Sequence, residues 1–298
     1  MNRNPPPHVL EAALAVSPAP LRHQRMGDIL VEAGRLAPED VDRILALQPG
    51  SGKRFGQLGQ ELGLLSAEDV RFALSVQFDF PYLSPDSLLS PELVMAHQPE
   101  SAVAEQWRGL RSQLALRGLA NSGVPHRLAL LSPDRREGRS VAAANLAIAW
   151  AQLGHRTLLI DADLRQPRQH LLFNLGHAAG LSDGLAGRGL AEGLIKPISG
   201  LRGLSVLPAG TPVPNPQELL ARPQMTQLLQ ALDEQHDLLV FDAPATSQCS
   251  DGLHVAAHCG AAVLLARRDV SSLPRLLQLS QGLRDLGVRV LGTVLRES

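Results

Sequence analysis

Two aspartates, Asp161 and Asp163, stand two residues apart at the end of an apolar run. If residues 157–160 form a strand, this spacing places both carboxylates on one face at the C-terminal end of that strand. In open α/β sheets, this edge is where ligands bind. Two carboxylates are costly to hold together there unless a cation or a hydrogen-bond donor lies beside them. The alternative is that they cap the following helix or pair with Arg165 and Arg168.

A loop that could hold phosphate groups precedes these aspartates. Loops of the form G-x-x-x-x-G-K-[ST] wrap phosphates with backbone N–H groups, and the Ser or Thr hydroxyl meets Mg²⁺. Gly138 and Ser140 match this pattern, and Arg139 stands where Lys is usual. Asp134 and Arg136 depart from it, because a Cβ resists positive φ and holds backbone N–H groups back from a ligand. The alternative is an ordinary strand–loop–helix connection.

From residue 127 onward, short apolar runs alternate with helix-like segments. We therefore expect an α/β domain with a mostly parallel sheet and helices on both faces, of the phosphate-loop NTPase-like kind. The expected strands cover residues 127–131, 157–160, 204–207, 238–241, 261–266 and 288–294. Asp242 follows the fourth of them, an arrangement that holds Mg²⁺ in phosphate-loop enzymes.

The N-terminal third differs from the rest of the chain in composition and in its pattern of apolar residues. Residues 1–22 are rich in Pro and Ala, and we expect them to be disordered. Residues 23–80 contain two copies of one pattern at an offset of 29 residues, and each copy predicts two helices. Residues 81–100, with several prolines and serines, are interpreted as a linker, and residues 101–298 as the α/β domain.

The repeated positions could form a ligand site. Arginine can bond to or stack on a base, glycine permits close backbone approach, and glutamine offers an amide. The candidate residues are Arg25, Gly27, Leu30, Gly34 and Gln48 in the first copy and Arg54, Gly56, Gly63 and Gln77 in the second. The one exception to the repeat is Gly59, which stands opposite Leu30. The alternative is a packed helical module that docks a partner.

Composition excludes several classes of protein. The chain has 28 basic and 29 acidic residues and only 3% aromatic residues, so nothing indicates a nucleic-acid surface. Cys249 and Cys259 fit reduced core thiols better than a metal site or a disulfide framework. No apolar run approaches the ~20 residues that span a bilayer. We expect a cytoplasmic protein that reaches a membrane only through a partner.

The motifs of the α/β part, taken together, resemble those of bacterial tyrosine kinases. The most similar type is the chain-length-determinant tyrosine kinase of exopolysaccharide synthesis (EpsG type). The helix-forming motif Glu105-x-x-Arg108-x-x-Arg111 is similar to the one that assembles such kinases into rings. The resemblance is carried by the segments at 132–133, 137–140, 145–147, 159–167, 180–182, 207–210, 215–220 and 242–244.

The resemblance implies ATP and Mg²⁺ as cofactors, phosphoryl transfer to tyrosine, and a membrane-embedded polysaccharide chain-length determinant protein as partner. It further implies a homo-oligomer formed through Glu105, Arg108 and Arg111. By carry-over, ATP would be bound by Glu137, Gly138, Arg139, Ser140 and Val141, the metal by Ser140, Asp161 and Asp242, and catalysis would rest on Asp161, Asp163 and Arg139.

Two features depart from this family pattern. Arg296 stands where such kinases often carry an Asn that reads adenine. The chain contains one tyrosine, Tyr82, so the phosphate acceptor is expected on another chain or at Tyr82 itself.

The repeat resembles the N-terminal domain of type II secretion and pilus ATPases. That resemblance implies control by cyclic di-GMP. The rival to the kinase hypothesis is a catalytically degenerate, non-enzymatic docking subunit of a polysaccharide assembly complex. A partitioning ATPase of the same fold is a third interpretation, but its extra Lys near the start of the loop is absent.

Overall fold

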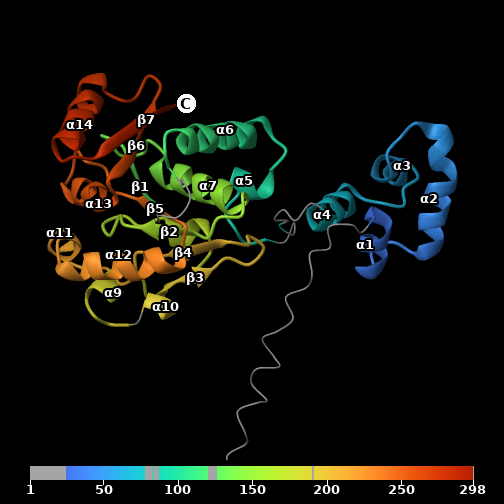
Figure 1. Ribbon diagram of the computed structural model, residues 1–298, viewed down its shortest axis with the longest axis horizontal. Coiled ribbons are helices and arrows are strands. Elements are labelled where there is room, and N and C mark those ends of the chain that lie inside the picture. Colours follow the sequence, from blue (N-terminus) through green and yellow to red (C-terminus); the bar gives the residue numbers. More distant parts are fainter. Residues whose placement is uncertain (1–24, 78–82, 84–86, 120–125, 190, 298) are drawn as a thin grey trace, which may run out of the picture. The chain divides into compact units, whose positions relative to one another are not determined.

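The computed structural model describes residues 25–77, 83, 87–119, 126–189 and 191–297 (Figure 1). The chain divides into two compact units, Met1–Tyr82 and Leu83–Ser298, and each is described by itself. The expectation of disorder over residues 1–22 falls outside the described residues, as does Tyr82.

The described part of the first unit is helical, and its two halves repeat in backbone conformation. Arg25 and Arg54, which precede the first helix of each half, both have φ −74° and ψ 152°. Gly34 and Gly63 end those helices with φ of 68° and 69°, a region that favours glycine. The four helices are α1 (Met26–Glu32), α2 (Pro38–Ser51), α3 (Phe55–Glu61) and α4 (Ala67–Gln77).

Small residues allow these helices to pack closely. A Cβ at Gly27 would lie 3.0 Å from the Val41 side chain. The equivalent glycine of the second copy, Gly56, faces Val70 in the same way, at 3.1 Å. Both glycines are buried, so the described structure gives them a packing role.

The exception to the repeat has a physical reason. A Cβ at Gly59 would lie 3.1 Å from Ile44 and closer still to Leu65, so no larger residue fits there. At the offset of 29 residues, Leu30 corresponds to Gly59 and Ile44 to Ala73, and Leu30 and Ala73 are both fully buried in the same core. Both large residues belong to the first copy and both small residues to the second, so a large residue compensates for each small one in the core volume.

The second unit is built on a mostly parallel seven-stranded sheet of order β3-β4-β2-β5-β1-β6-β7. The predicted α/β fold is confirmed. The strands are β1 (His126–Leu131), β2 (Thr157–Asp161), β3 (Lys196–Pro197), β4 (Leu204–Leu207), β5 (Leu238–Asp242), β6 (Ala261–Arg267) and β7 (Arg289–Arg296). Among the described strands, only the short β3 is antiparallel to its neighbour, and it was not predicted because two residues carry no strand periodicity.

Helices cover both faces of this sheet. Alternate residues of β1 point to opposite faces, so Leu128 and Leu130 join one core while Ala129 and Leu131 join the other. Helices α5 (Val94–His97), α6 (Ala102–Leu116), α7 (Arg139–Ala151) and α8 (Gln169–Leu172) contribute to the first core. Helices α9 (Leu181–Leu185), α11 (Pro216–Leu220), α12 (Pro223–Gln235), α13 (Asp251–Cys259) and α14 (Leu273–Asp285) contribute to the second, and the short α10 (Ala191–Leu194) adds Leu194 to it.

Much of the segment expected to be a linker belongs to the second unit. Met95 is fully buried, and its N–H donates to Asn145 Oδ1 at 2.9 Å. Gln152 donates to the Met95 carbonyl at 2.9 Å. The apolar residues interleaved with the prolines of residues 87–100 therefore pack α5 onto α7, which the composition of the segment does not reveal.

Candidate nucleotide site

The loop between β1 and α7 ends at the start of a long helix. Gly138 is the residue before α7, with φ 85°, so the first N–H groups of the helix remain without intrahelical partners. Together with the helix dipole, they form a setting that favours anions. Arg136 also has positive φ, at 61°, a conformation that is strained for a residue with a Cβ. The loop therefore has, at position 136, a backbone conformation that glycine usually adopts.

Arg139 reaches from this loop to the adjoining strand ends. Its Nε donates to the Ala243 carbonyl at 2.8 Å, and its Nη1 donates to the Asp134 carbonyl at 2.9 Å and to Ser132 Oγ. Its Nη2 lies 3.8 Å from an Asp163 carboxylate oxygen. The guanidinium is thus largely buried, hydrogen-bonded to neutral oxygens and loosely paired with one carboxylate.

Asp161 and Asp242 lie side by side at the ends of β2 and β5, in register, and both are fully buried. Burial and the neighbouring Asp242 raise the pKa of Asp161 well above its ordinary value. Burial likewise raises the pKa of Asp242 to about 6, although Ser140, Gln169 and Arg139 oppose the rise. Two buried carboxyl groups are therefore held next to each other, and one oxygen of Asp242 has no hydrogen-bond partner.

Asp161 caps the following helix and does not pair with the side chain of Arg165 or Arg168. Asp161 Oδ2 accepts from the N–H groups of Arg168 and Gln169, both at 2.9 Å, so it does cap α8. Pairing with the arginine side chains is wrong, because Arg165 pairs with Asp251 at 2.7 Å and Arg168 with Glu92 at 2.6 Å.

Two buried oxygens test whether this site fits a cation. Asp242 Oδ1 and Gln169 Oε1 are both buried and have no hydrogen-bond partner. Carboxylate and amide oxygens suit Mg²⁺, which commonly takes one or two carboxylates and completes its shell with water and phosphate oxygens. Among the described residues, no group of three or more His, Cys, Asp or Glu is arranged to hold a metal alone. The site fits a cation that arrives with a phosphate ligand.

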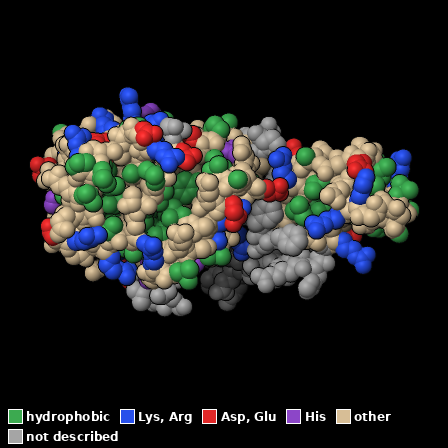
Figure 2. Space-filling view, turned by 90° about the horizontal axis from the view of Figure 1, so that it is seen from above, with side chains coloured by type: hydrophobic (Ala, Val, Ile, Leu, Met, Phe, Trp, Pro, Cys, Tyr) green, Lys and Arg blue, Asp and Glu red, His purple; other side chains and the backbone are tan. Residues whose placement is uncertain are grey.

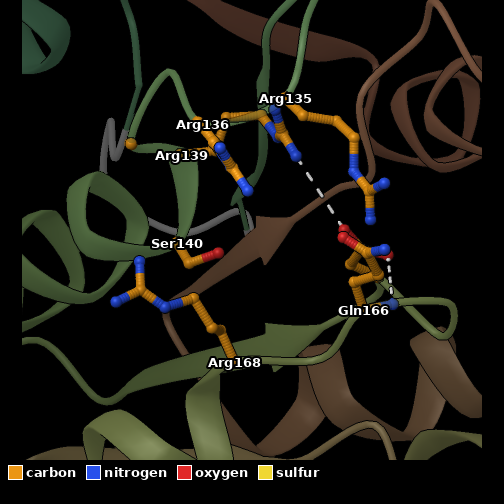
Figure 3. A pocket seen from close by; sticks show the side chains of 8 residues that line it. Arg135, Arg136, Arg139, Ser140, Gln166 and Arg168 are labelled. Atoms are coloured by element: carbon orange, nitrogen blue, oxygen red, sulfur yellow. Dashed lines mark hydrogen bonds and ion pairs between the residues drawn. The ribbon is translucent and has the colours of Figure 1, made fainter.

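A cavity of about 550 Å³ adjoins this site through Ser140, whose carbonyl accepts from Gln169. Its wall contains four arginines and only one carboxylate, that of Asp163. Figure 3 shows Arg135, Arg136 and Arg139 entering from one side, Gln166 and Arg168 from the opposite side, and Ser140 between them. The lining residues are Arg135, Arg136, Gly138, Arg139, Ser140, Asp163, Gln166 and Arg168. The charge and size of the cavity suit a polyphosphate.

Two predicted ATP-binding residues do not line this cavity. The Glu137 carboxylate is buried and accepts from the Asp134 N–H at 2.9 Å and from Ser271 Oγ, so it fixes the loop internally. Val141 packs, partly buried, against the core. The cavity therefore brings together Gly138, Arg139, Ser140 and Asp163, with Asp161 and Asp242 beneath.

Four lining residues and one buried contact were not predicted from the sequence. Arg135, Arg136 and Arg168 were not assigned to ligand binding, although a run of arginines inside a candidate phosphate loop is a usable signal. Gln166 and Gln169 carried no signal, because an isolated glutamine in a Pro-containing segment is common.

Arg296, at the end of β7, lies directly against the loop. Any side chain at position 138 would overlap with the Arg296 guanidinium. The positive φ of Gly138 therefore favours glycine, and a larger residue would also have to displace the Arg296 guanidinium.

The repeat residues proposed for a dinucleotide are divided between surface and core. Arg25, Arg54, Gly34 and Gly63 are exposed. Leu30 is fully buried, so its expected contact with a ligand is corrected: it belongs to the core, because α1 turns it inward. Gln48 donates to the Lys53 carbonyl at 3.3 Å, and Gln77 is half-buried.

The predicted assembly motif lies on α6 as expected. Arg108 pairs with Glu105 at 2.7 Å and donates to the Pro99 carbonyl at 2.8 Å. Arg111 donates to the Ala149 carbonyl of α7 at 2.9 Å. Within one chain, these side chains tie α6 to its surroundings.

The sheet order, the loop at the start of α7 and the aspartates at neighbouring strand ends define a phosphate-loop NTPase-like domain. A search of family models found no match. The putative tyrosine-protein kinase CapB of Staphylococcus aureus is 31% identical over 211 residues, which cover 71% of this chain and 91% of CapB. The tyrosine-protein kinase Etk of Escherichia coli K12 is 32% identical over 205 residues, covering 69% of this chain and 28% of Etk. The chain belongs to the bacterial tyrosine-protein kinases.

The solved kinase domain of Escherichia coli Etk agrees with this family. It matches with a TM-score of 0.67 at 28% identity, over 72% of this chain and 82% of that chain. The chain spans only about a quarter of the full Etk protein. Across the described residues, no helix has the length and hydropathy to cross a bilayer.

Proposed function

We propose that the second unit binds ATP with Mg²⁺ and transfers the γ-phosphoryl group to a tyrosine of another chain. The biological setting would be the control of chain length in exopolysaccharide synthesis, at the cytoplasmic side, with a membrane-embedded chain-length determinant protein as partner. The family membership supports the reaction class. The single observation that carries the proposal is the unpartnered Asp242 Oδ1 beneath a cavity lined by arginines.

Each residue has a role that its position supports. The N–H groups at the start of α7 and the guanidinium groups of Arg135, Arg136, Arg139 and Arg168 would hold the phosphate oxygens. Ser140 and Asp242 would hold Mg²⁺, with Asp161 beside them. When bound, Mg²⁺ would neutralise charge that builds on the phosphate oxygens.

Asp163 is the group placed to orient the attacking hydroxyl. It is the only carboxylate in the cavity wall, and its other contacts are the N–H groups of Arg165 and Gln166 at 3.3 and 3.0 Å. A carboxylate in this position can accept a hydrogen bond, and then the proton, from a tyrosine hydroxyl.

Radiolabelled ATP with the purified chain and a Glu/Tyr copolymer tests this function. We expect label on the polymer with the wild type and its loss with Asp161→Asn. Asp285→Asn, an exposed carboxylate that bonds only to Gln281 in the described structure, is the matched control. Nucleotide binding without label transfer, or no binding at all, would instead support the non-enzymatic docking subunit.

For the repeat unit, we propose control by cyclic di-GMP. The support is the exposure of Arg25 and Arg54 at equivalent positions with the same backbone conformation. Calorimetry of the full chain with cyclic di-GMP tests it, with Arg54→Ala as the variant and Arg43→Ala, another exposed arginine of the same unit, as the control. Absence of heat at high micromolar ligand would reject the proposal and leave docking as the role of the repeat.

We further propose self-association through α6. Val103 and Leu116 are exposed on this helix at 47% and 88%, and the Glu105–Arg108 pair lies on the same helix. Figure 2 shows apolar side chains gathered on the face of the second unit that carries α6 and α14. Sedimentation of the wild type against Arg108→Ala tests the assembly, which should shift to a smaller species in the variant.

A further inference from the structure

Gln169 connects the three residues proposed as metal ligands. Its backbone N–H donates to Asp161 Oδ2 at 2.9 Å. Its side-chain Nε2 donates to Asp242 Oδ2 at 2.8 Å and to the Ser140 carbonyl at 3.0 Å. The side chain is fully buried. A single residue at the start of α8 thus joins β2, β5 and α7.

The orientation of the Gln169 amide follows from its partners. Asp242 Oδ2 and the Ser140 carbonyl oxygen are both acceptors, so the NH₂ group must face them and the carbonyl oxygen must face away. That oxygen, Oε1, has no partner, and neither has Asp242 Oδ1. A buried acceptor without a donor costs stability, and two of them in one contact pair indicate that a positively polarised group belongs nearby.

We propose that Gln169 is a positioning residue for the cation of this site. Its amide holds Asp242 through Oδ2, which keeps Oδ1 free for a divalent cation, and it offers Oε1 to the water that such a cation carries. The inference rests on the proposed nucleotide-binding function. Outer-shell amides of this kind orient a metal ligand and raise metal affinity.

A purely structural role makes a different prediction. If Gln169 only filled space at the start of α8, an unbranched apolar side chain of equal length would preserve the site. Gln169→Met is that substitution. It keeps the backbone N–H bond to Asp161 but removes the amide that holds Asp242.

The experiment measures two affinities of the full chain separately. Electron paramagnetic resonance of free Mn²⁺ gives the metal affinity of the ADP-loaded protein, and calorimetry in EDTA gives the ADP affinity without metal. We expect Gln169→Met to weaken Mn²⁺ binding about tenfold or more and to leave metal-free ADP binding within about twofold of the wild type.

Two further variants complete the design. Gln152→Met removes an amide hydrogen bond to the Met95 carbonyl, away from the site, and should change neither affinity. Gln169→Asn, whose shorter amide cannot span both acceptors, should also weaken Mn²⁺ binding and serves if Gln169→Met does not fold. Unchanged Mn²⁺ affinity in a folded Gln169 variant, or equal losses with and without metal, overturns the inference. If the wild type binds neither ADP nor Mn²⁺, the proposed function itself fails.

Discussion

The two units differ in how they treat polar groups. In the described repeat unit, Ser75 is the only buried polar residue, and the candidate ligand residues Arg25 and Arg54 lie at the surface. The α/β unit buries Asp161, Asp242 and other charged side chains at one end of its sheet. Burying charge is costly, so a fold retains it where something else compensates. We infer that the α/β unit contains a site that its own residues leave incomplete, whereas the repeat unit has a core that is complete without a ligand.

The largest expected effect is at Arg139. Arg139→Ala removes the guanidinium that spans the loop and the end of β5, and we expect the affinity for Mg-ADP to fall about 100-fold, or about 3 kcal/mol. Arg139→Lys, which restores the usual phosphate-loop residue, is the matched control and should stay within about threefold of the wild type. Calorimetry measures both. If the wild type and Arg139→Ala bound Mg-ADP equally, Arg139 would not be waiting for a ligand. The α/β site would then be as complete by itself as the core of the repeat unit.

The next effect tests the packing of the repeat unit. Gly59→Leu inserts a side chain where a Cβ already lies 3.1 Å from Ile44, and we expect a loss of about 2 kcal/mol of stability. Hydrogen exchange over residues 25–77 in the full chain measures it. The double variant Gly59→Leu with Ile44→Ala should recover most of the loss, because it gives this pair the residue sizes of the equivalent pair, Leu30 and Ala73. If the double variant did not recover stability, the pairing of one large with one small residue would not explain how the core of the repeat unit is filled.

The sequence was sufficient for what depends on periodicity and strand ends. The expected strand over 204–207 follows from an apolar run, and the structure confirms it. The sequence also predicted Asp161 and Asp242 at the ends of two strands, and they end β2 and β5, but their side-by-side placement was not predicted. Contacts between distant segments could not be predicted. The Gln169 amide meets Asp242 across 73 residues of sequence, and the sequence pattern carries no trace of that contact. The packing of residues 87–100 on α7 was missed for the same reason.

A smaller effect concerns the pH dependence of stability. The pKa of Asp242 is raised from 3.8 to about 6 in the fold, so the folded state binds more protons than the unfolded state between these values. The stability of the metal-free protein should therefore fall as pH rises from about 4 to 6, and the penalty should persist above 6. Asp242→Asn removes this penalty, and we expect a gain in stability at pH 8 that vanishes near pH 4.

Urea unfolding of the wild type and Asp242→Asn at both pH values measures this gain. Asp285→Asn, an exposed carboxylate on α14, should show no such gain at pH 8. A variant that is less stable than the wild type at pH 8 would mean that Asp242 is already compensated within the protein, and the contrast between the two units would disappear.

The smallest effect is expected where the loop meets α14. Arg275 pairs with the Asp134 carboxylate at 2.7 Å, but its side chain is 60% exposed, so solvent screens the pair. Arg275→Ala should cost about 0.5 kcal/mol of stability or less. The buried Glu137, which accepts from the Asp134 N–H and from Ser271, holds the same loop without such screening. Glu137→Gln should therefore lower the melting temperature more than Arg275→Ala. If the order were reversed, the loop would depend on its exposed ion pair, and burial of charge would no longer distinguish the site from the rest of the chain.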